Sequence, residues 1–288
     1  MTIWNLGSIN ADLVYAVPHL PGPGETLAAT SLTRGLGGKG ANMSVAAARA
    51  AARVAHIGAV GSDGAWAVER LMEYGVDTRF IAQVGHPTGH AVITVDPAGE
   101  NAITILGGAN QAVPAERVGQ ALSQAAAGDI FLTQNETNGQ AEAARTARDL
   151  GLRVAYAAAP FDAQAVQALL PFLDLLILNE VEAEQMSAAT GLAIPDLPVQ
   201  DSLVTLGARG CRWYSIAGPR DFAAHKVTAV DTTGAGDTFS GYVVAGLDRG
   251  LPMAQAISQA MRAAAIMVTR HGTADVIPDL KDVQDTIL

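Results

Sequence analysis

The chain has 288 residues, of which 49% are hydrophobic and 16% are charged, enough for one large α/β domain and inconsistent with long disordered stretches. Its 28 acidic residues outnumber the 18 basic ones, and the net charge of −10 argues against nucleic acid as a partner. A single cysteine, Cys211, excludes an internal disulfide and fits a reducing cytoplasm. We expect no signal peptide and no membrane partner, because the chain shows neither a basic leader nor a run of about 20 apolar residues.

The first predicted strand spans residues 2–9 and leads directly into Asn10 and Asp12. Polar residues just past the carboxyl end of a parallel strand are where α/β enzymes bind ligands. We therefore single out both side chains as candidate binding residues. Asp12 has a second interpretation, as an ordinary turn residue after a strand.

A glycine-rich segment, Gly35–Asn42, opens the first predicted helix. Four of its first six residues are glycine, which destabilises a helix and therefore indicates a close approach to the backbone. The helix consists largely of alanine, is expected to end near Arg53, and should pack closely against a flat surface. A strand over residues 54–60 and a helix over residues 65–74 follow.

Two alternating segments, residues 91–96 and 102–106, flank a turn and predict a β-hairpin. Residues 13–36 are rich in turns and in polar residues typical of strands. Together the segments 13–36 and 91–106 are expected to form a small β-sheet that projects from the core. Such a projection is a candidate lid over a binding site.

From Pro114 onward, predicted helices alternate with predicted strands, which indicates a parallel sheet with helices on both faces. The predicted helices span residues 114–127, 139–150, 163–170 and 253–268, and the predicted strands span residues 129–133, 153–157, 175–178 and 204–206. An antiparallel pair is expected at residues 211–216 and 221–230, with Cys211 as a strand residue and not a nucleophile. We therefore expect a single α/β domain over residues 1–288, with a Rossmann-like, mostly parallel sheet and a small β-sheet lid.

The segment Asp231–Thr238 is a glycine-rich turn between a strand-like run, residues 225–230, and an apolar helical pattern. A helix start has unpaired N–H groups and a partial positive charge, and Gly234 and Gly236 carry no side chain that would block a phosphate. These features predict an anion cradle. Asp237 does not favour anion binding, so a carboxylate beside a phosphate needs a chemical role. The alternative is that Asp237 only caps the helix.

Two motifs, Gly37-Gly38-Lys39-Gly40-Ala41-Asn42 and Asp231-Thr232-Thr233-Gly234-Ala235-Gly236-Asp237, resemble those of the ribokinase-like (phosphofructokinase-B type) carbohydrate kinase family. The resemblance covers nearly the whole chain, since further matching segments follow in the family's order: Gly7–Asp12, Pro23–Thr26, Asn179–Glu182 and Thr205–Gly210. Within the family it is nearest to the ribokinases. It implies ATP-dependent phosphorylation of a sugar hydroxyl, with conversion of ribose to ribose 5-phosphate as the first expectation.

The resemblance also implies roles for individual residues in the sugar site. Asp237 is implied to be the catalytic base, and the N–H groups of Gly234, Ala235 and Gly236 are implied to form the anion hole for the γ-phosphate. The implied sugar-binding residues are Asn10, Asp12, Gly38, Lys39, Asn42 and Glu136. A short carboxylate such as Asp12 can accept hydrogen bonds from two vicinal hydroxyls. Two alternatives remain: Asn42 is only a polar residue in the first turn of a helix, and Lys39 is only a solvated side chain.

For ATP and metals the resemblance implies three sites. The implied nucleotide-binding residues are Asn179, Thr205, Gly207, Gly210 and Met261. Glu182 is implied to position Mg²⁺ through waters, since Mg²⁺ keeps much of its hydration shell. The implied monovalent cation site, for K⁺, consists of Asp231 and Thr233 with the backbone carbonyls of Met267, Arg270 and Gly272. Asp231 has a turn role as its alternative, and Val276 stands where ribokinases often carry serine.

The sequence specifies the family more closely than it specifies the substrate. Ala157–Pro160 replaces the Asn-Pro-Ala-Pro common in ribokinases, and residues 192–203 are too few for the helix that close relatives have there. Alternative substrates are a fructose-type ketose, deoxyribose or a nucleoside, and GTP or ADP are alternative donors. A nucleoside needs aromatic residues for stacking, and the chain has few early ones, Tyr15 and Trp66.

Two further expectations concern partners. A non-catalytic sugar-binding regulatory protein is the alternative from another class, and the glycine cradle with Asp237 argues against it, because a binder needs neither. The projecting sheet is expected to close over the sugar and to pair two subunits into a homodimer, because its edges and one face would otherwise be uncovered.

Overall fold

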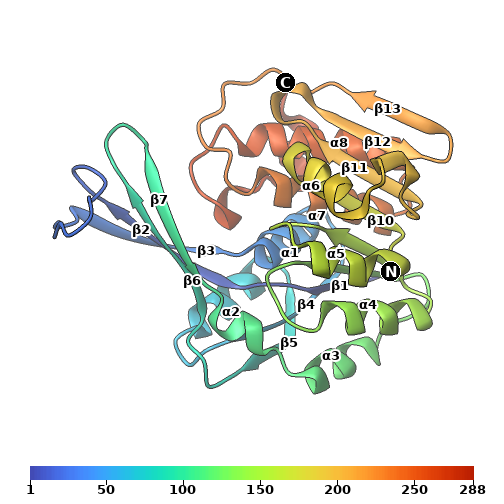
Figure 1. The fold of residues 1–288 in the computed structure, drawn as a ribbon, viewed down its shortest axis with the longest axis horizontal. Coiled ribbons are helices and arrows are strands. Elements are labelled where there is room, and N and C mark those ends of the chain that lie inside the picture. Colours follow the sequence, from blue (N-terminus) through green and yellow to red (C-terminus); the bar gives the residue numbers. More distant parts are fainter.

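A computed structural model describes the whole chain, residues 1–288. The main sheet has nine strands in the order β13-β12-β11-β10-β9-β8-β1-β4-β5, parallel from β11 to β5, with β12 and β13 antiparallel at one edge (Figure 1). Its strands are β1 (Ile3–Leu6), β4 (Val54–Val60), β5 (Asp77–Gln83), β8 (Ile130–Gln134), β9 (Arg153–Ala157), β10 (Leu175–Asn179), β11 (Asp201–Thr205), β12 (Cys211–Ser215) and β13 (Gly218–Phe222). The Rossmann-like, mostly parallel sheet expected from the sequence is confirmed.

Helices cover both faces of the main sheet. One face carries α1 (Lys39–Arg49), α2 (Ala65–Glu73), α7 (Ala235–Asp248), α8 (Met253–Met267) and α9 (Leu280–Asp285), and the other carries α3 (Ala115–Leu122), α4 (Gln140–Asp149), α5 (Ala163–Leu169) and α6 (Glu180–Thr190). Short 3-10 helices link them: η1 (Gly108–Ala112), η2 (Leu170–Phe172), η3 (Ile194–Asp196), η4 (Gly207–Arg209) and η5 (Ala274–Val276). None of the helices has the length and apolar content that a membrane crossing requires.

The side chains of the neighbouring strands β1 and β4 alternate between two hydrophobic cores, one on each face of the sheet. Ile3 and Val54 belong to the core beneath α1, α7 and α8, while Trp4 belongs to the core beneath α3 to α6. Because successive side chains along a strand point to opposite faces, Asn5 and His56 lie on the α1 side. Both are fully buried, which makes them polar residues inside an apolar layer.

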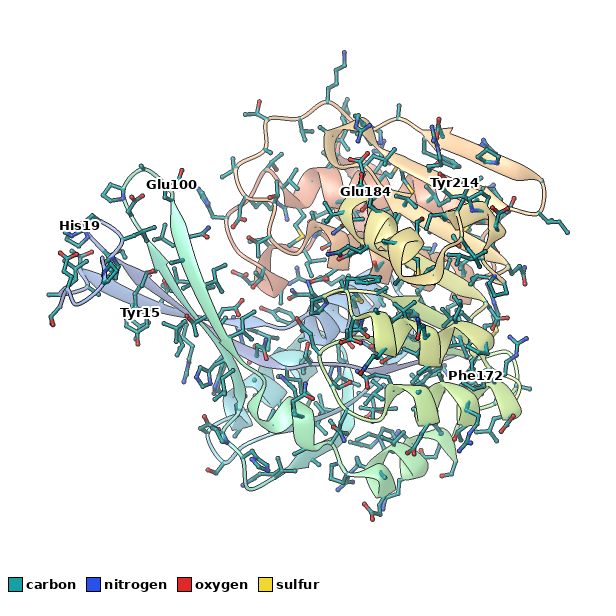
Figure 2. The ribbon with its side chains drawn as sticks, viewed as in Figure 1. Tyr15, His19, Glu100, Phe172, Glu184 and Tyr214 are labelled. Carbon is teal, nitrogen blue, oxygen red and sulfur yellow. The ribbon has the colours of Figure 1, made fainter.

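A separate four-stranded sheet, in the order β3-β2-β6-β7, projects from the body of the molecule (Figure 1). Its strands are β2 (Asn10–Ala16), β3 (Ser31–Gly37), β6 (Gly89–Val95) and β7 (Asn101–Leu106). Side chains such as Tyr15 and Glu100 lie on this projection, well away from Tyr214 of the main sheet (Figure 2). The small sheet expected from residues 13–36 and 91–106 is therefore present, and its first strand begins earlier, at Asn10.

The strand predicted over residues 225–230 is wrong, and so is the second half of the strand predicted over 221–230. The chain leaves the sheet after β13, because the partner strand β12 offers only five residues for pairing. Residues 223–230 form no strand, and the N–H groups of Val230 and Asp231 donate to the Val268 carbonyl at the end of α8. The glycine turn is thus preceded by a loop that is held against the end of α8, and not by a strand.

Other differences lie at the edges of the fold. The edge strand β5 was not predicted, because its mixed sequence Asp77–Gln83 buries only Phe80 and Ala82 deeply. The short α9 was also missed, and α1 ends at Arg49 instead of near Arg53. Between Gly191 and the start of β11 at Asp201 the only helix is the three-residue η3, so the absence of a full helix there is confirmed.

Cys211 lies buried in β12, as expected of a strand residue. Burial raises the pKa of its thiol to about 12, so the reactive thiolate is disfavoured at neutral pH. The structure therefore agrees with a packing role and not with a nucleophile.

Candidate active site

The first turns of α1 and α7 meet at the site. Asn42 in α1 donates its Nδ2 to Oδ2 of Asp237 in α7 at 2.9 Å, and both side chains are buried. Gly234 caps α7 with φ 74°, and a Cβ at this position would lie 2.9 Å from Cε of Met267. A Cβ at Gly236 would meet no atom within 4 Å, so that side of the cradle is open. The fold thereby brings the two glycine motifs of the sequence together.

Glycines allow α1 to start directly against the end of β1. A Cβ at Gly40 would lie 2.4 Å from the Gly7 backbone, and a Cβ at Gly37 would lie 2.1 Å from the Asp12 carboxylate. Any side chain at these glycines would push the two segments apart. This explains why the sequence concentrates glycine just before α1, where helix propensity alone would exclude it.

Glu136 follows β8 and reaches back to the α1 start. Its Oε2 accepts hydrogen bonds from the Ser8 hydroxyl and from the Lys39 backbone N–H, the latter at 3.1 Å. Ser8 is fully buried, and its Oγ also accepts the Gly40 N–H at 3.2 Å. Glu136 and Lys39 were predicted from the sequence but Ser8 was not, because its only signal was its position between Gly7 and Asn10 in a turn that begins with glycine.

Three carboxylates share this site with one lysine. Burial, together with Glu136 and Asp237, raises the pKa of Asp12 to about 6, and the causes of this shift include no hydrogen bond from the protein. Burial likewise raises the pKa of Asp237, although Lys39 and the bond from Asn42 oppose the shift. The Asp237 charge raises the pKa of Lys39 despite its burial, with Glu136 and Glu182 acting in the same direction. Lys39 is therefore a partly buried positive charge within the field of these carboxylates.

Asn10 begins β2 and is held by a second asparagine, Asn110, which was not predicted from the sequence. Asn110 of η1 donates to Oδ1 of Asn10 at 2.7 Å and accepts the Ile9 N–H at 2.9 Å. Both asparagines are buried. Oδ1 of Asn10 thus accepts from the protein, and the side chain keeps its amide N–H groups as donors.

Asn179 and Glu182 form the start of α6, directly after β10. The Asn179 side chain accepts the Glu182 N–H at 2.8 Å, and Oε2 of Glu182 accepts the Asn179 N–H at 2.7 Å. This is a capping box, so the spacing has a structural reason independent of any metal. Burial raises the pKa of Glu182, which Lys39 partly offsets.

The other predicted nucleotide residues lie on β11, the turn that follows it, and α8. Thr205 ends β11, Gly207 begins η4 with φ 58°, and Met261 lies half-buried on α8. Gly210 has φ 110°, and a Cβ there would lie 1.9 Å from the Phe222 carbonyl oxygen. Glycine at this position is thus required by the close approach of β13, whatever its role toward a nucleotide.

Asp231 ties together the two segments of the predicted cation site. Its Oδ1 accepts the Thr233 N–H at 2.9 Å and its Oδ2 accepts the Gly272 N–H at 3.3 Å. Burial raises the pKa of Asp231, but these hydrogen bonds outweigh it and the pKa lies below its usual range. The Met267 carbonyl already accepts the Arg270 N–H at 2.9 Å. The structure therefore holds a charged carboxylate directly before the anion cradle.

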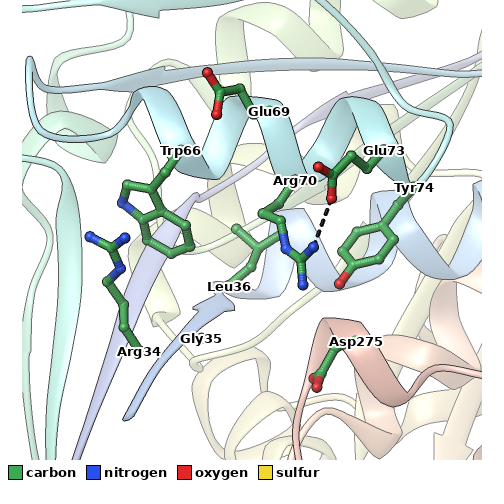
Figure 3. Close-up of a pocket in the computed structure, with 9 residues that line it drawn as sticks. All are labelled: Arg34, Gly35, Leu36, Trp66, Glu69, Arg70, Glu73, Tyr74 and Asp275. Carbon is green, nitrogen blue, oxygen red and sulfur yellow. Dashed lines mark hydrogen bonds and ion pairs between the residues drawn. The ribbon is translucent and has the colours of Figure 1, made fainter. Parts of the chain in front are cut away.

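A cavity of about 330 Å³ lies between β3, α2 and η5, apart from these residues (Figure 3). The Arg34 guanidinium lies 4.3 Å from the centre of the Trp66 ring, and Arg70 pairs with Glu73 at 2.7 Å. None of the predicted site residues lines this cavity. The Trp66 ring is therefore packed against Arg34 in this cavity, apart from the predicted site residues.

The sequence matches the pfkB family of carbohydrate kinases over residues 2–280. The chain belongs to this family. It is 37% identical over 292 residues to a ribokinase of Haemophilus influenzae, covering 96% of this chain and 95% of that protein. Among solved structures it resembles a ribokinase of Thermotoga maritima, with 32% identity, a TM-score of 0.88, and coverage of 98% and 97% of the two chains. It also resembles an Arabidopsis thaliana ribokinase complexed with ribose and ATP, with 30% identity, a TM-score of 0.84, and coverage of 98% and 96%.

Proposed function

We propose that this carbohydrate kinase transfers the γ-phosphoryl group of ATP to the 5-hydroxyl of ribose. The observation that carries the proposal is Asp237, a buried carboxylate in the first turn of α7, directly after the glycine cradle and hydrogen-bonded by Asn42. A sugar-binding protein without activity needs no carboxylate beside an anion site. The similarity to ribokinases, including one complexed with ribose and ATP, supports the choice of sugar and donor.

Asp237 acts on the attacking hydroxyl. Phosphoryl transfer passes through a loose transition state, so the base mainly orients the hydroxyl and takes its proton late. Lys39 and the Asn42 N–H favour the ionised form of Asp237, which is the form that accepts the proton. The buried position keeps bulk water from the carboxylate and strengthens these interactions.

The start of α7 stabilises charge on the transferred group. The first full turn of the helix closes with the Thr238 N–H bonded to the Gly234 carbonyl at 2.8 Å, so N–H groups before it lack partners within the helix. The Ala235 N–H makes a 3.3 Å bond to the Thr232 carbonyl, which a phosphate oxygen would replace. Lys39 adds a positive charge on the sugar side.

Ribose is held by acceptors and donors that the protein leaves free. Asp12 has no protein hydrogen bond among the causes of its raised pKa and can accept from two vicinal hydroxyls. Oδ1 of Asn42 is buried without a hydrogen-bond partner, so a ligand hydroxyl would satisfy it. Asn10 offers its amide N–H groups, and Glu136 and the backbone at Gly38 complete the set of proposed contacts.

Mg²⁺ with ATP fits the residues present. Only Oε2 of Glu182 is used by the capping box, which leaves Oε1 to bind a water of the metal. When bound, the ion neutralises charge on the β- and γ-phosphates. Asn179, Thr205, Gly207, Gly210 and Met261 are proposed to hold the nucleotide on this side of the cradle.

A monovalent cation, K⁺, is proposed beside the cradle. Asp231 supplies the fixed negative charge, and the N–H groups of Thr233 and Gly272 link it to the two segments whose carbonyls are proposed as ligands. Carboxylate and carbonyl oxygens suit a large, weakly hydrated cation. The proposed ligands are Asp231, Thr233 and the carbonyls of Met267, Arg270 and Gly272, and the expected effect of the cation is on the geometry of the cradle.

The projecting sheet is proposed to close over ribose and to pair with the sheet of a second copy. Its edge strand β7 is exposed along its whole length, and Ile103, Ile105 and Leu106 are each about half exposed or more. Leu32 on the opposite edge strand is also 53% exposed. Exposed edges and apolar faces of this kind are normally covered, and a second copy offers a matching surface.

The proposed reaction is tested with a panel of acceptors in a coupled assay for ADP release. Ribose, deoxyribose, fructose and adenosine are compared at equal concentration with ATP, and ATP is then exchanged for GTP. The proposal requires ribose to give the highest kcat/KM with ATP as donor. A higher kcat/KM for any other acceptor would contradict the choice of ribose, and no turnover of any acceptor would contradict the kinase assignment for this panel.

A further inference from the structure

A chain of buried polar side chains lies beneath the two glycine turns of the site. Asn5 in β1 and His56 in β4 occupy paired positions of neighbouring parallel strands and are both fully buried. Both lie on the face covered by α1, where Ser44 is also fully buried. The catalytic mechanism proposed above uses none of these three groups.

The directions of the hydrogen bonds in this chain follow from its two ends. His56 Nε2 lies 3.0 Å from the Gly7 carbonyl oxygen, which can only accept, so Nε2 carries the proton. Burial lowers the pKa of His56 to about 4, although the bond to Gly7 opposes this, so the ring is neutral at pH 7 and Nδ1 is an acceptor. Nδ1 therefore accepts from the Ser44 hydroxyl, at 2.8 Å.

The other end is fixed in the same way. Asn5 Nδ2 donates to the Gly40 carbonyl and to the Ser44 oxygen, both at 2.8 Å. Its Oδ1 accepts Nε2 of Gln134 at 2.9 Å. The donors thus run from Gln134 through Asn5, Ser44 and His56 to the Gly7 carbonyl, and one tautomer of His56 satisfies every bond.

This chain of hydrogen bonds holds together the end of β1 and the start of α1, the two segments that meet at the site. Gly7 and Gly40 are the glycines whose close contact brings α1 onto β1, and the Gly7 carbonyl accepts from His56 while the Gly40 carbonyl accepts from Asn5. Ser8 follows Gly7 and Lys39 precedes Gly40, and both bond to Glu136. Gly58 leaves room for the bond, since a Cβ there would lie 2.9 Å from His56 Nε2 and 3.0 Å from the Gly7 oxygen.

We propose that His56, as the neutral Nε2–H tautomer, is a positioning residue for the sugar site, acting through Ser44, Asn5 and the Gly7 carbonyl to fix Ser8, Lys39 and Glu136. The inference rests on the sugar site proposed above. It assigns His56 no contact with substrate. It predicts that loss of the chain of hydrogen bonds weakens sugar binding, while ATP binding, assigned to β11, α6 and α8, is unaffected.

Three variants test this role. His56→Phe keeps the ring size and removes both hydrogen bonds, His56→Gln restores a donor and an acceptor, and Tyr242→Phe is the control. Tyr242→Phe also removes one buried hydrogen bond, 2.8 Å to the Pro278 carbonyl, at a place outside the site. The KM values for ribose and ATP and kcat are measured for each folded variant, and folding is checked by thermal unfolding.

We expect His56→Phe to raise the ribose KM by about tenfold or more, because a displacement near 1 Å costs up to about 100-fold in efficiency. The ATP KM should stay unchanged, His56→Gln should recover most of the loss, and Tyr242→Phe should match the parent. A fall in kcat with both KM values unchanged would indicate a smaller active fraction only and would overturn the proposal. If His56→Phe does not fold, Ser44→Ala is measured instead, with the same expected split.

A spectroscopic test uses the unsubstituted protein and does not depend on its kinase activity. Two-dimensional 15N NMR of the imidazole at pH 7 should show the His56 ring neutral, with its proton on Nε2. A proton on Nδ1 or a charged ring would overturn the proposal even if ribose is phosphorylated. If the acceptor panel identifies another sugar, ribose is wrong as the substrate, and the His56 variants are then compared on that sugar. Failure of the proposed substrate is therefore distinguishable from failure of the proposed role of His56.

Discussion

The amide of Asn42 donates to the carboxylate of Asp237 at 2.9 Å, across 195 residues of sequence. The bond joins the first turns of α1 and α7, the two helices that the glycine motifs open. It gives Asp237 a fixed direction and helps to keep it ionised, since Asn42 donates to the charged form. The remaining acceptor of Asn42 is buried and unpaired, so the same side chain can hold a ligand hydroxyl beside the base.

Substitution of the proposed base should abolish turnover without abolishing binding. We expect Asp237→Asn to lower kcat by at least about 10²–10⁴-fold, the range for loss of general base catalysis. Calorimetry should still detect ribose and ATP. Asp248→Asn, at the other end of α7 and also buried, is the matched control and should retain parental kcat. A kcat for Asp237→Asn within a few-fold of the parent would disprove the assignment.

Asp12 should reduce the stability of the ligand-free protein at neutral pH. Its folded pKa of about 6 lies above the ordinary value of 3.8. Below about pH 4 Asp12 is protonated in both the folded and the unfolded state and lowers the stability of neither. The loss of stability appears as the pH rises through about 6, where burial opposes ionisation of the folded protein. We expect Asp12→Asn to stabilise the free protein at pH 7 by on the order of 2 kcal/mol, measured by denaturant unfolding, with no gain at pH 4.

The same substitution should weaken ribose binding, because the ionised carboxylate is the acceptor for the sugar. Asp63→Asn is the control of opposite sign: hydrogen bonds from Thr88 lower the pKa of Asp63, so its loss should destabilise the protein at pH 7. Equal stability of Asp12→Asn and the parent at pH 7 would contradict the raised pKa of Asp12.

Removal of the Asn42 amide should shift the acid limb of the pH profile. The bond from Asn42 lowers the pKa of Asp237, so Asn42→Leu should raise that pKa and move the acid limb of kcat to higher pH. The ribose KM should also rise, because the free acceptor of Asn42 is lost. An acid limb at the parental pH would show that Asn42 does not act on the ionisation of Asp237.

K⁺ should activate turnover through Asp231. With K⁺ titrated from zero in tetramethylammonium buffer at fixed ionic strength, we expect kcat of the parent to rise and that of Asp231→Ala to stay flat. Asp221→Ala, which removes an exposed carboxylate paired with Arg212, should respond like the parent. A parent that does not respond, or full activation of Asp231→Ala, would rule out the proposed cation site.

The projecting sheet should mediate dimerisation. Light scattering at micromolar concentration is expected to show a dimer for the parent and a monomer for Ile105→Glu, since Ile105 is 62% exposed on the edge strand. Ile216→Glu changes a fully exposed isoleucine between β12 and β13 and should leave the dimer intact. A monomeric parent would contradict the proposal, as would a dimeric Ile105→Glu variant.

The sequence by itself determined the parts of this protein that depend on local chemistry. The apolar run 54–60 became β4 with the predicted bounds, and the glycine turn before Asp237 became the start of α7. Periodicity and glycine content report burial and backbone conformation within a few residues, so both were predictable. The strand predicted over residues 225–230 was wrong because composition is also a local property. The run has the composition of a strand, but a strand forms only where a neighbouring strand offers a free edge.

Only the tertiary structure decided which distant residues meet. Ser8 and Asn110 were missed because a hydroxyl or an amide in a turn has no distinctive local pattern, and its role depends on the partner that the fold supplies. Asn5 and His56 were visible as polar residues within apolar strands, but their pairing follows from the register of β1 against β4. The raised pKa of Asp12 likewise needs Glu136 and Asp237 nearby. Charge, desolvation and hydrogen-bond direction depend on three-dimensional distance, which a sequence does not specify residue by residue.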